Sequence, residues 1–202
     1  MKKNFRLLLL CLLPLSLSGC VTALVGAGAF GVMSATDRRS TGAQADDQVM
    51  EVRIQNTALT HLRNNNTIQG FEPKLSVVSF NRQVLLMGLV ASEADKAFVE
   101  RVARAQPNAE KIYNYIQVAT SARGFGEVSN DSWVTSKVRT TLLGTKGVSA
   151  NHVKVVTYNG VTYVMGILTP EEQALVSNTV STTAGVQQVV TLYETFVPSN
   201  VR

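Results

Sequence analysis

Few residues of this chain have the types and the spacing that chemistry requires. Its two cysteines, Cys11 and Cys20, are too few for a Cys-rich zinc site, and its two histidines, His61 and His152, offer little for a His-based metal centre. The sequence contains no G-x-S-x-G, H-E-x-x-H or Walker motif. It therefore predicts a protein that is not an enzyme and that uses no metal or other cofactor.

Cys20 is the residue whose surroundings predict a defined modification. A basic start at residues 2–6 precedes an apolar stretch, Leu7 to Leu17, that is too short to span a bilayer. The stretch ends in Leu17-Ser18-Gly19-Cys20, which is similar to the lipobox of bacterial lipoproteins, where the cysteine thiol accepts a diacylglyceryl group. We therefore expect a signal peptide over residues 1–19 and an acylated Cys20 that carries palmitate-type chains. A plain secretory signal with an incidental cysteine is the alternative.

The residues after Cys20 predict a destination and a tether. Lipoproteins of this kind that have Asp after the cysteine usually stay at the inner membrane, so Val21 predicts the periplasmic leaflet of the outer membrane. Two or more acyl chains hold a protein stably on a membrane. Residues 20–46 predict a lipidated, flexible linker. Its run from Gly26 to Gly31 fits G-x-G-x-x-G, but no strand-length segment precedes it, so we interpret it as tether rather than as a dinucleotide loop.

Composition bounds the remaining classes of function. The formal net charge of +5 includes Lys2, Lys3 and Arg6, so the chain beyond them carries only +2. A nearly neutral chain lacks the basic surface that nucleic-acid binding requires, and no nucleic-acid partner is expected. A hydrophobic content of 45% is enough for a packed core.

The rest of the chain carries one pattern twice. Residues 74–118 align without gaps with residues 152–196. The pairs of identical residues include Val77/Val155, Asn81/Asn159, Met87/Met165, Gly88/Gly166, Glu93/Glu171, Val102/Val180 and Tyr115/Tyr193. Together with the same order of structural signals, these identities indicate an internal repeat in which each copy reads αββαβ.

Each copy opens with an amphipathic helix and a hairpin. The first helix has an apolar face of Ile54, Ala58, Leu59 and Leu62, with Asp46 or Asp47 as its cap. The second has Val134, Val138, Thr141 and Leu142, with Asn130, Asp131 or Ser132 as its cap. The hairpins are expected at residues 75–90 and 153–168, and they turn at Asn81-Arg82 and at Asn159-Gly160.

Each copy closes with a second helix and a last strand. The second helices begin at the capping sequences of Ser92 and Thr169, and the last strands are expected at 112–118 and 188–196. The predicted buried stripes are Ala94, Phe98, Val102 and Ala105 in the first copy, and Leu175, Val176, Thr179 and Val180 in the second. We expect domains at 47–120 and 128–197, joined by a hinge at 121–127.

The αββαβ repeat, the Val-rich hairpins and the glycine near each hairpin's end resemble the BON domain family. Two such units behind a lipobox are similar to the dual BON-domain outer-membrane lipoproteins, as is the segment Asn130–Arg139 with its single tryptophan. The resemblance implies an α+β fold of two tandem domains, each with a small three-stranded mixed sheet packed by two helices. It also implies binding of anionic phospholipid, such as phosphatidylglycerol or cardiolipin, and a role in envelope integrity at the division site.

In that family the lipid surface lies on the first helix of the second domain, which matches Trp133 to Leu143 here. The lipid-binding residues implied are Trp133, Ser136, Lys137, Arg139, Thr140 and Leu143. Helical angles agree, because they place Trp133 and Leu143 off the core face beside Lys137. Two alternatives stay open: Trp133 packs between the domains or against its own sheet, or the protein is an adaptor for envelope protein partners that dock on the sheet edges.

Overall fold

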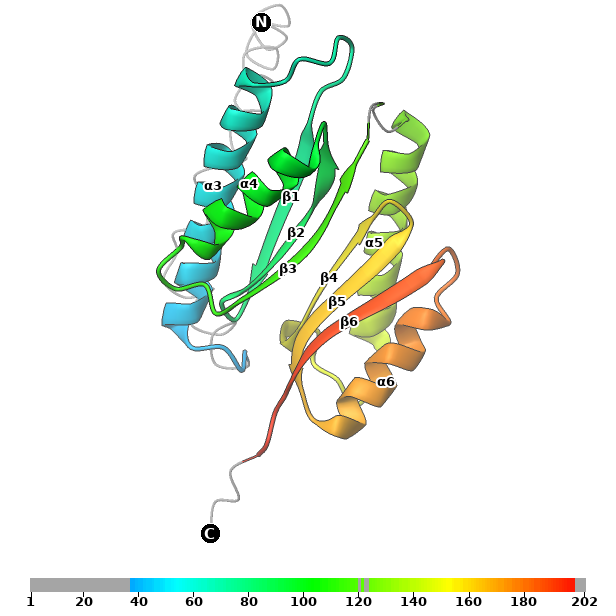
Figure 1. Cartoon of the computed structure of the whole chain (residues 1–202). Coiled ribbons are helices and arrows are strands. Elements are labelled where there is room, and N and C mark those ends of the chain that lie inside the picture. Colours follow the sequence, from blue (N-terminus) through cyan, green and yellow to red (C-terminus); the bar gives the residue numbers. More distant parts are fainter. Residues whose placement is uncertain (1–36, 120, 122–123, 199–202) are drawn as a thin grey trace, which may run out of the picture. The chain divides into compact units, whose positions relative to one another are not determined.

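A computed structural model describes residues 37–119, 121 and 124–198 (Figure 1). The predicted signal peptide, Cys20 and residues 21–36 of the predicted tether lie outside the described residues. The first repeat consists of α3 (Thr41–Asn64), β1 (Lys74–Phe80), β2 (Gln83–Val90), α4 (Glu93–Arg104) and β3 (Lys111–Val118). The second consists of α5 (Phe125–Gly144), a short 3-10 turn η2 (Ala150–His152), β4 (Val153–Tyr158), β5 (Val161–Leu168), α6 (Pro170–Ser181) and β6 (Gln188–Thr195).

Each repeat builds a three-stranded mixed sheet, as predicted. The orders are β1-β2-β3 and β4-β5-β6, with the hairpin strands antiparallel and the last strand parallel to the central one. Asn81, Arg82, Asn159 and Gly160 all have positive φ at the two hairpin turns. Such turns match the right-handed twist of paired strands, which is why Asn and Gly mark them in the sequence.

The first helix of each repeat begins earlier than the sequence predicted. Ser40 caps α3 by accepting a hydrogen bond from the Ala43 amide, and Gly124 precedes α5 with its own amide bonded to the Glu127 carboxylate. The predicted caps Asp46, Asp47, Asn130, Asp131 and Ser132 therefore lie inside the helices. As a result α3 begins within the segment expected to be a linker, and α5 begins within the expected hinge.

The second helices have the predicted caps but a different buried stripe in the first repeat. Ser92 caps α4, and Thr169 forms a capping box with Glu172 at the start of α6. Val99 and Ala103 are the buried residues of α4, whereas the predicted Ala94 and Ala105 are exposed. The predicted stripe is shifted by one residue from the buried one, because alanines lie on both sides of it and do not mark where the apolar face ends. In α6 the predicted Val176 and Val180 are buried.

The helices of each repeat cover one face of its own sheet. Met50, Ile54, Ala58 and Leu62 of α3 pack with Val84 and Leu86 of β2 and with Val99 of α4. Val134, Val138 and Leu142 of α5 pack in the same way with Val164 of β5 and Val176 of α6. Thr141, which the sequence placed on this face, is exposed, and its hydroxyl donates to the Lys137 carbonyl at 3.0 Å.

The opposite faces of the two sheets share a third core. It joins Phe80, Leu85 and Met87 of the first repeat to Tyr163, Met165, Ile167 and Leu192 of the second. Burial here, together with the neighbouring Tyr115 and Tyr158, raises the pKa of Tyr163 to about 12. Strands β2 and β5 are therefore covered on both faces. The two repeats pack together as one body, and both lie within a single compact unit of the chain.

Two adjacent arginines hold the start of the folded part to both repeats. Arg38 donates to the Ile167 carbonyl at 2.8 Å, pairs with the Glu172 carboxylate and lies over the Phe196 ring at 4.1 Å. Arg39 pairs with Asp47 at 2.9 Å and lies over the Phe80 ring at 4.2 Å. Burial alone would raise the pKa of Glu172. Hydrogen bonds from the Arg38 guanidinium and the Thr169 amide outweigh this effect, so the pKa lies below its ordinary value. The pair with Arg38 is therefore charged at neutral pH.

Candidate functional site: the exposed face of α5

The solvent side of α5 carries large apolar side chains. Trp133 is 54% exposed and Leu143 is 73% exposed, and Val128 at the N-terminal end of the helix is also exposed. Val134, Val138 and Leu142 hold the other side of α5 on the sheet, so this orientation is fixed by the core. Lone exposed apolar residues are ordinary on a protein surface, whereas α5 exposes three of them along its length.

Trp133 is exposed and at the same time supported by its own domain. Its ring lies against Gly185 in the loop between α6 and β6, where an added Cβ would come within 2.8 Å of the indole. The Lys137 ammonium sits 4.5 Å from the ring centroid, in a cation–π contact. The tryptophan is therefore neither between the domains nor under its own sheet, and a cation accompanies it.

Small hydroxyls fill the surface between the apolar residues. Ser132, Ser136 and Thr140 donate to the carbonyls of Val128, Ser132 and Ser136, at 3.0, 2.9 and 2.9 Å. Such i−4 bonds satisfy the hydroxyl hydrogens inside the helix. Less hydrogen bonding to water is then lost when this face leaves bulk solvent.

Arg139 lies on the other side of this surface and has a partner within the domain. Its guanidinium donates to the Val155 carbonyl of the edge strand β4 at 2.7 Å. Thr135, one turn earlier, accepts from the Thr157 amide of the same strand at 2.8 Å. The two α5 side chains thus occupy backbone groups that an edge strand otherwise offers to another strand.

Side chains of α3 cover the edge strand of the first sheet in the same way. Glu51 accepts from the Ser79 amide of β1 at 2.6 Å, and Gln55 donates to the Leu75 carbonyl at 2.6 Å. Sequence reasoning missed both pairs. In the sequence, each pair is visible only as two polar residues spaced i, i+4 beside the apolar stripe of the first helix. The same spacing is typical of a helix face exposed to solvent, so it does not indicate a contact with the sheet edge.

The first repeat offers a weaker version of the α5 surface. Pairing the buried residues Met50 with Val134 and Ile54 with Val138 puts Val49 at the position of Trp133. Val49 is 46% exposed, and Arg53 takes the place of Lys137. The helix position is therefore shared, but the aromatic ring is particular to α5.

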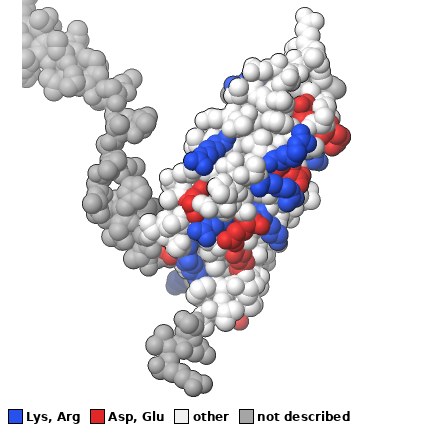
Figure 2. Space-filling view, turned by 60° about the vertical axis from the view of Figure 1, so that its left-hand side comes forward, with Lys and Arg blue, Asp and Glu red and all other residues white. Residues whose placement is uncertain are grey.

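Neither a membrane-spanning helix nor a metal cluster is found in the described part of the chain. No helix there is long and apolar enough to cross a bilayer, and no three His, Cys, Asp or Glu side chains there lie together as metal ligands. The Lys and Arg side chains that Figure 2 shows on one face alternate with Asp and Glu rather than forming a single-sign field.

The BON domain model matches the chain twice, at residues 51–120 and 130–192. The chain therefore belongs to the BON domain family, with one domain in each repeat.

Relatives extend the likeness to the whole chain. The chain is 30% identical to the outer membrane lipoprotein DolP of Haemophilus influenzae over 178 residues, which cover 88% of this chain and 89% of that protein. It is also 30% identical to a 21 kDa hemolysin of Actinobacillus pleuropneumoniae over 76% of each chain. The architecture and the first of these relatives define a two-BON-domain outer-membrane lipoprotein.

Among solved structures, CdsD of the Chlamydia trachomatis type III secretion system matches with a TM-score of 0.29 and 17% identity. The match covers 73% of this chain and 63% of that one.

Proposed function

We propose that this lipoprotein binds anionic phospholipid through the exposed face of α5 and thereby supports the integrity of the outer membrane, at the division site in particular. The exposed Trp133 with Lys137 beside it is the observation that carries the proposal. An indole is favoured at a bilayer interface, where its ring reaches the acyl boundary while its N–H stays wet. Leu143 adds a second apolar contact farther along the helix.

Charge supplies the lipid preference. Each Lys or Arg near an anionic surface adds about 1 kcal/mol of attraction. Lys137 and Arg139 flank the apolar residues, while Ser136 and Thr140 between them have their hydroxyl hydrogens bonded within the helix. Phosphatidylglycerol and cardiolipin are the expected partners.

The anchor and the surface have different tasks in this proposal. Acyl chains on Cys20 keep the protein at the membrane and raise the effective concentration of α5 there. The face itself is small, so we expect weak binding from α5 alone. The anchor supplies residence, and α5 supplies the choice of lipid.

Vesicle co-sedimentation of residues 21–202, which carry no acyl anchor, tests the proposal. We expect binding to vesicles that contain phosphatidylglycerol or cardiolipin, and about tenfold less binding to purely zwitterionic vesicles. Trp133→Glu should abolish binding because it places a negative charge at the apolar contact.

Val49→Glu is the matched control, since Val49 occupies the same helix position in the first domain at similar exposure. It should leave vesicle binding unchanged. If the folded chain binds neither vesicle, or if both variants weaken binding equally, the α5 proposal is wrong.

The second candidate function is that of a protein adaptor, and the edge strand β3 of the first sheet is the place where a partner could dock. The edges β1 and β4 have backbone groups bonded by their own helices, whereas β3 exposes Tyr115 and Val118. An adaptor of this kind would tolerate Trp133→Glu and lose its partner when Val118 is changed to Lys.

A further inference from the structure

We infer that the hollow between the C-terminal half of α5 and strand β4 is a site for one amphiphilic phosphate, with the phosphate at Arg139 and the first part of an alkyl chain against the wall below it. This inference rests on the proposed function and adds a mode of binding to it. The exposed face of α5 meets a lipid surface, whereas this hollow takes a single molecule.

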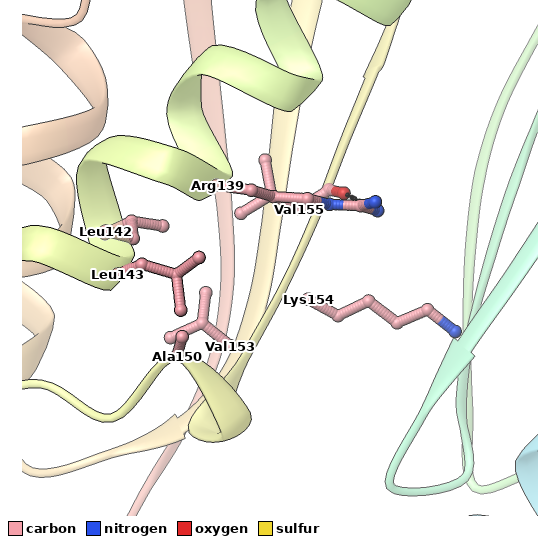
Figure 3. Close-up of a pocket in the computed structure, with 7 residues that line it drawn as sticks. All are labelled: Arg139, Leu142, Leu143, Ala150, Val153, Lys154 and Val155. Atoms are coloured by element: carbon pink, nitrogen blue, oxygen red, sulfur yellow. Dashed lines mark hydrogen bonds between the residues drawn. The ribbon is translucent and has the colours of Figure 1, made fainter.

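The hollow has an apolar wall of the right size for part of a chain. Its volume is about 250 Å³, and Leu142, Leu143, Ala150 and Val153 form the wall (Figure 3). Pockets for whole drug-sized ligands span about 300–1,000 Å³, so this one suits a phosphate with a few methylenes rather than a complete phospholipid. Each buried methylene contributes about 0.8 kcal/mol.

Arg139 provides the charge at the rim. Among the described residues, no carboxylate pairs with its guanidinium, which donates to the Val155 carbonyl at 2.7 Å. That bond fixes the guanidinium in place while leaving other N–H donors of the fork for a phosphate. A preordered, uncompensated guanidinium beside an apolar wall is complementary to an anion that carries an alkyl chain.

Lys154 lines the same hollow but is already neutralised. Its ammonium bonds the Glu51 carboxylate at 2.5 Å and the Ser79 carbonyl at 3.0 Å, and Figure 3 shows it directed away from Leu143. The charge that selects the ligand is therefore Arg139, and Lys154 serves the contact between the two domains.

The hollow is separate from the tryptophan. Trp133 and Lys137 contact each other and the loop at Gly185, and neither lines the hollow. Changes at Arg139 can thus be distinguished from changes at Trp133, which makes the inference testable on its own.

The test titrates hexyl phosphate, below its micelle concentration, into ¹⁵N-labelled residues 21–202. We expect saturable shifts of the amides of Ala150, Val153 and Val155, with inorganic phosphate and hexanol each binding at least about tenfold more weakly, because each supplies only half of the contact. Arg139→Gln should weaken binding about tenfold or more while keeping a donor for the strand, as Gln55 does in the first domain. Ala150→Phe should also block binding, by filling the hollow.

Lys137→Gln is the charge-matched control and should leave these shifts unchanged. Shifts centred on Trp133, or shifts that persist unaltered in Arg139→Gln, would overturn the inference. Vesicle binding that Trp133→Glu abolishes and Ala150→Phe preserves would then still support the proposed function. Hexyl phosphate binding at Arg139 without any vesicle binding would instead support the hollow and refute the proposed function.

Discussion

At Gly88 the backbone of the neighbouring strand occupies the space that a side chain would need. A Cβ there would lie 2.3 Å from the Lys74 carbonyl oxygen, whereas the equivalent Cβ at Gly166 would lie 2.9 Å from the His152 carbonyl oxygen. At both glycines the close approach comes from the backbone of the chain that pairs with the strand. Both contacts are with backbone, so relief requires a shift of β1 or of the chain entering β4.

Gly88→Ala should therefore lower the free energy of unfolding by about 3 kcal/mol, and Gly166→Ala by about 1–2 kcal/mol, as overpacking typically does. Urea unfolding followed by circular dichroism measures both. Gly126→Ala is the control, because nothing lies within 4 Å of its Cβ position. Equal losses at Gly88 and Gly126 would contradict the steric argument.

Helix and hairpin are joined in each domain by a buried aspartate. Asp47 accepts from the amides of Asn81 and Arg82 at 2.8 and 2.7 Å, and Asp131 accepts from those of Asn159 and Gly160 at 2.7 and 3.0 Å. Each carboxylate thus satisfies the amides of a type I′ turn from the side of the helix. This arrangement explains two acidic residues that the sequence had suggested as helix caps.

Asp131→Ala should lower the free energy of unfolding by about 1–3 kcal/mol, since two amides of the turn lose their acceptor. Asp47→Ala should cost more, because Asp47 also accepts from the Ser79 hydroxyl and pairs with Arg39. Chemical denaturation of the two variants gives the comparison. If Asp131→Ala unfolds at the wild-type midpoint, this carboxylate does not hold the hairpin.

Local signals predicted the elements well and their surroundings less well. The predicted strand bounds agree with the observed ones to within one residue, because turn residues and β-branched runs specify a strand through the local sequence alone. Asp47 and Asp131 misled because an inward acidic residue near a helix start has the same local sequence as a cap. The exposure of Trp133 could be expected from helical angle, but its contact with Gly185 could not, since that loop lies far along the chain.

For the molecule as a whole, the shared core between the sheets matters most. The sequence indicates this core through the apolar runs Val84–Val90 and Val161–Leu168. A strand that is buried on both faces lacks the alternation of apolar and polar residues that a half-exposed strand shows. Phe80, Leu85 and Met87 would be exposed in an isolated first domain. The two domains should therefore unfold together, and Arg38 and Arg39 strengthen that coupling from the N-terminal side.

Trp133, the chain's one tryptophan, lies in the second domain and makes this coupling measurable from the first. Leu85→Ala removes a fully buried side chain from the shared core and should lower the free energy of unfolding by about 2–5 kcal/mol. If the domains unfold as one, the Trp133 fluorescence transition moves to lower urea together with the circular dichroism transition. Val52→Ala, at an exposed position of the first domain, should move neither. A fluorescence midpoint that stays at the wild-type value while circular dichroism splits into two steps would show that the sheets pack without cooperating, because the second domain would then keep its fold after the first had lost it.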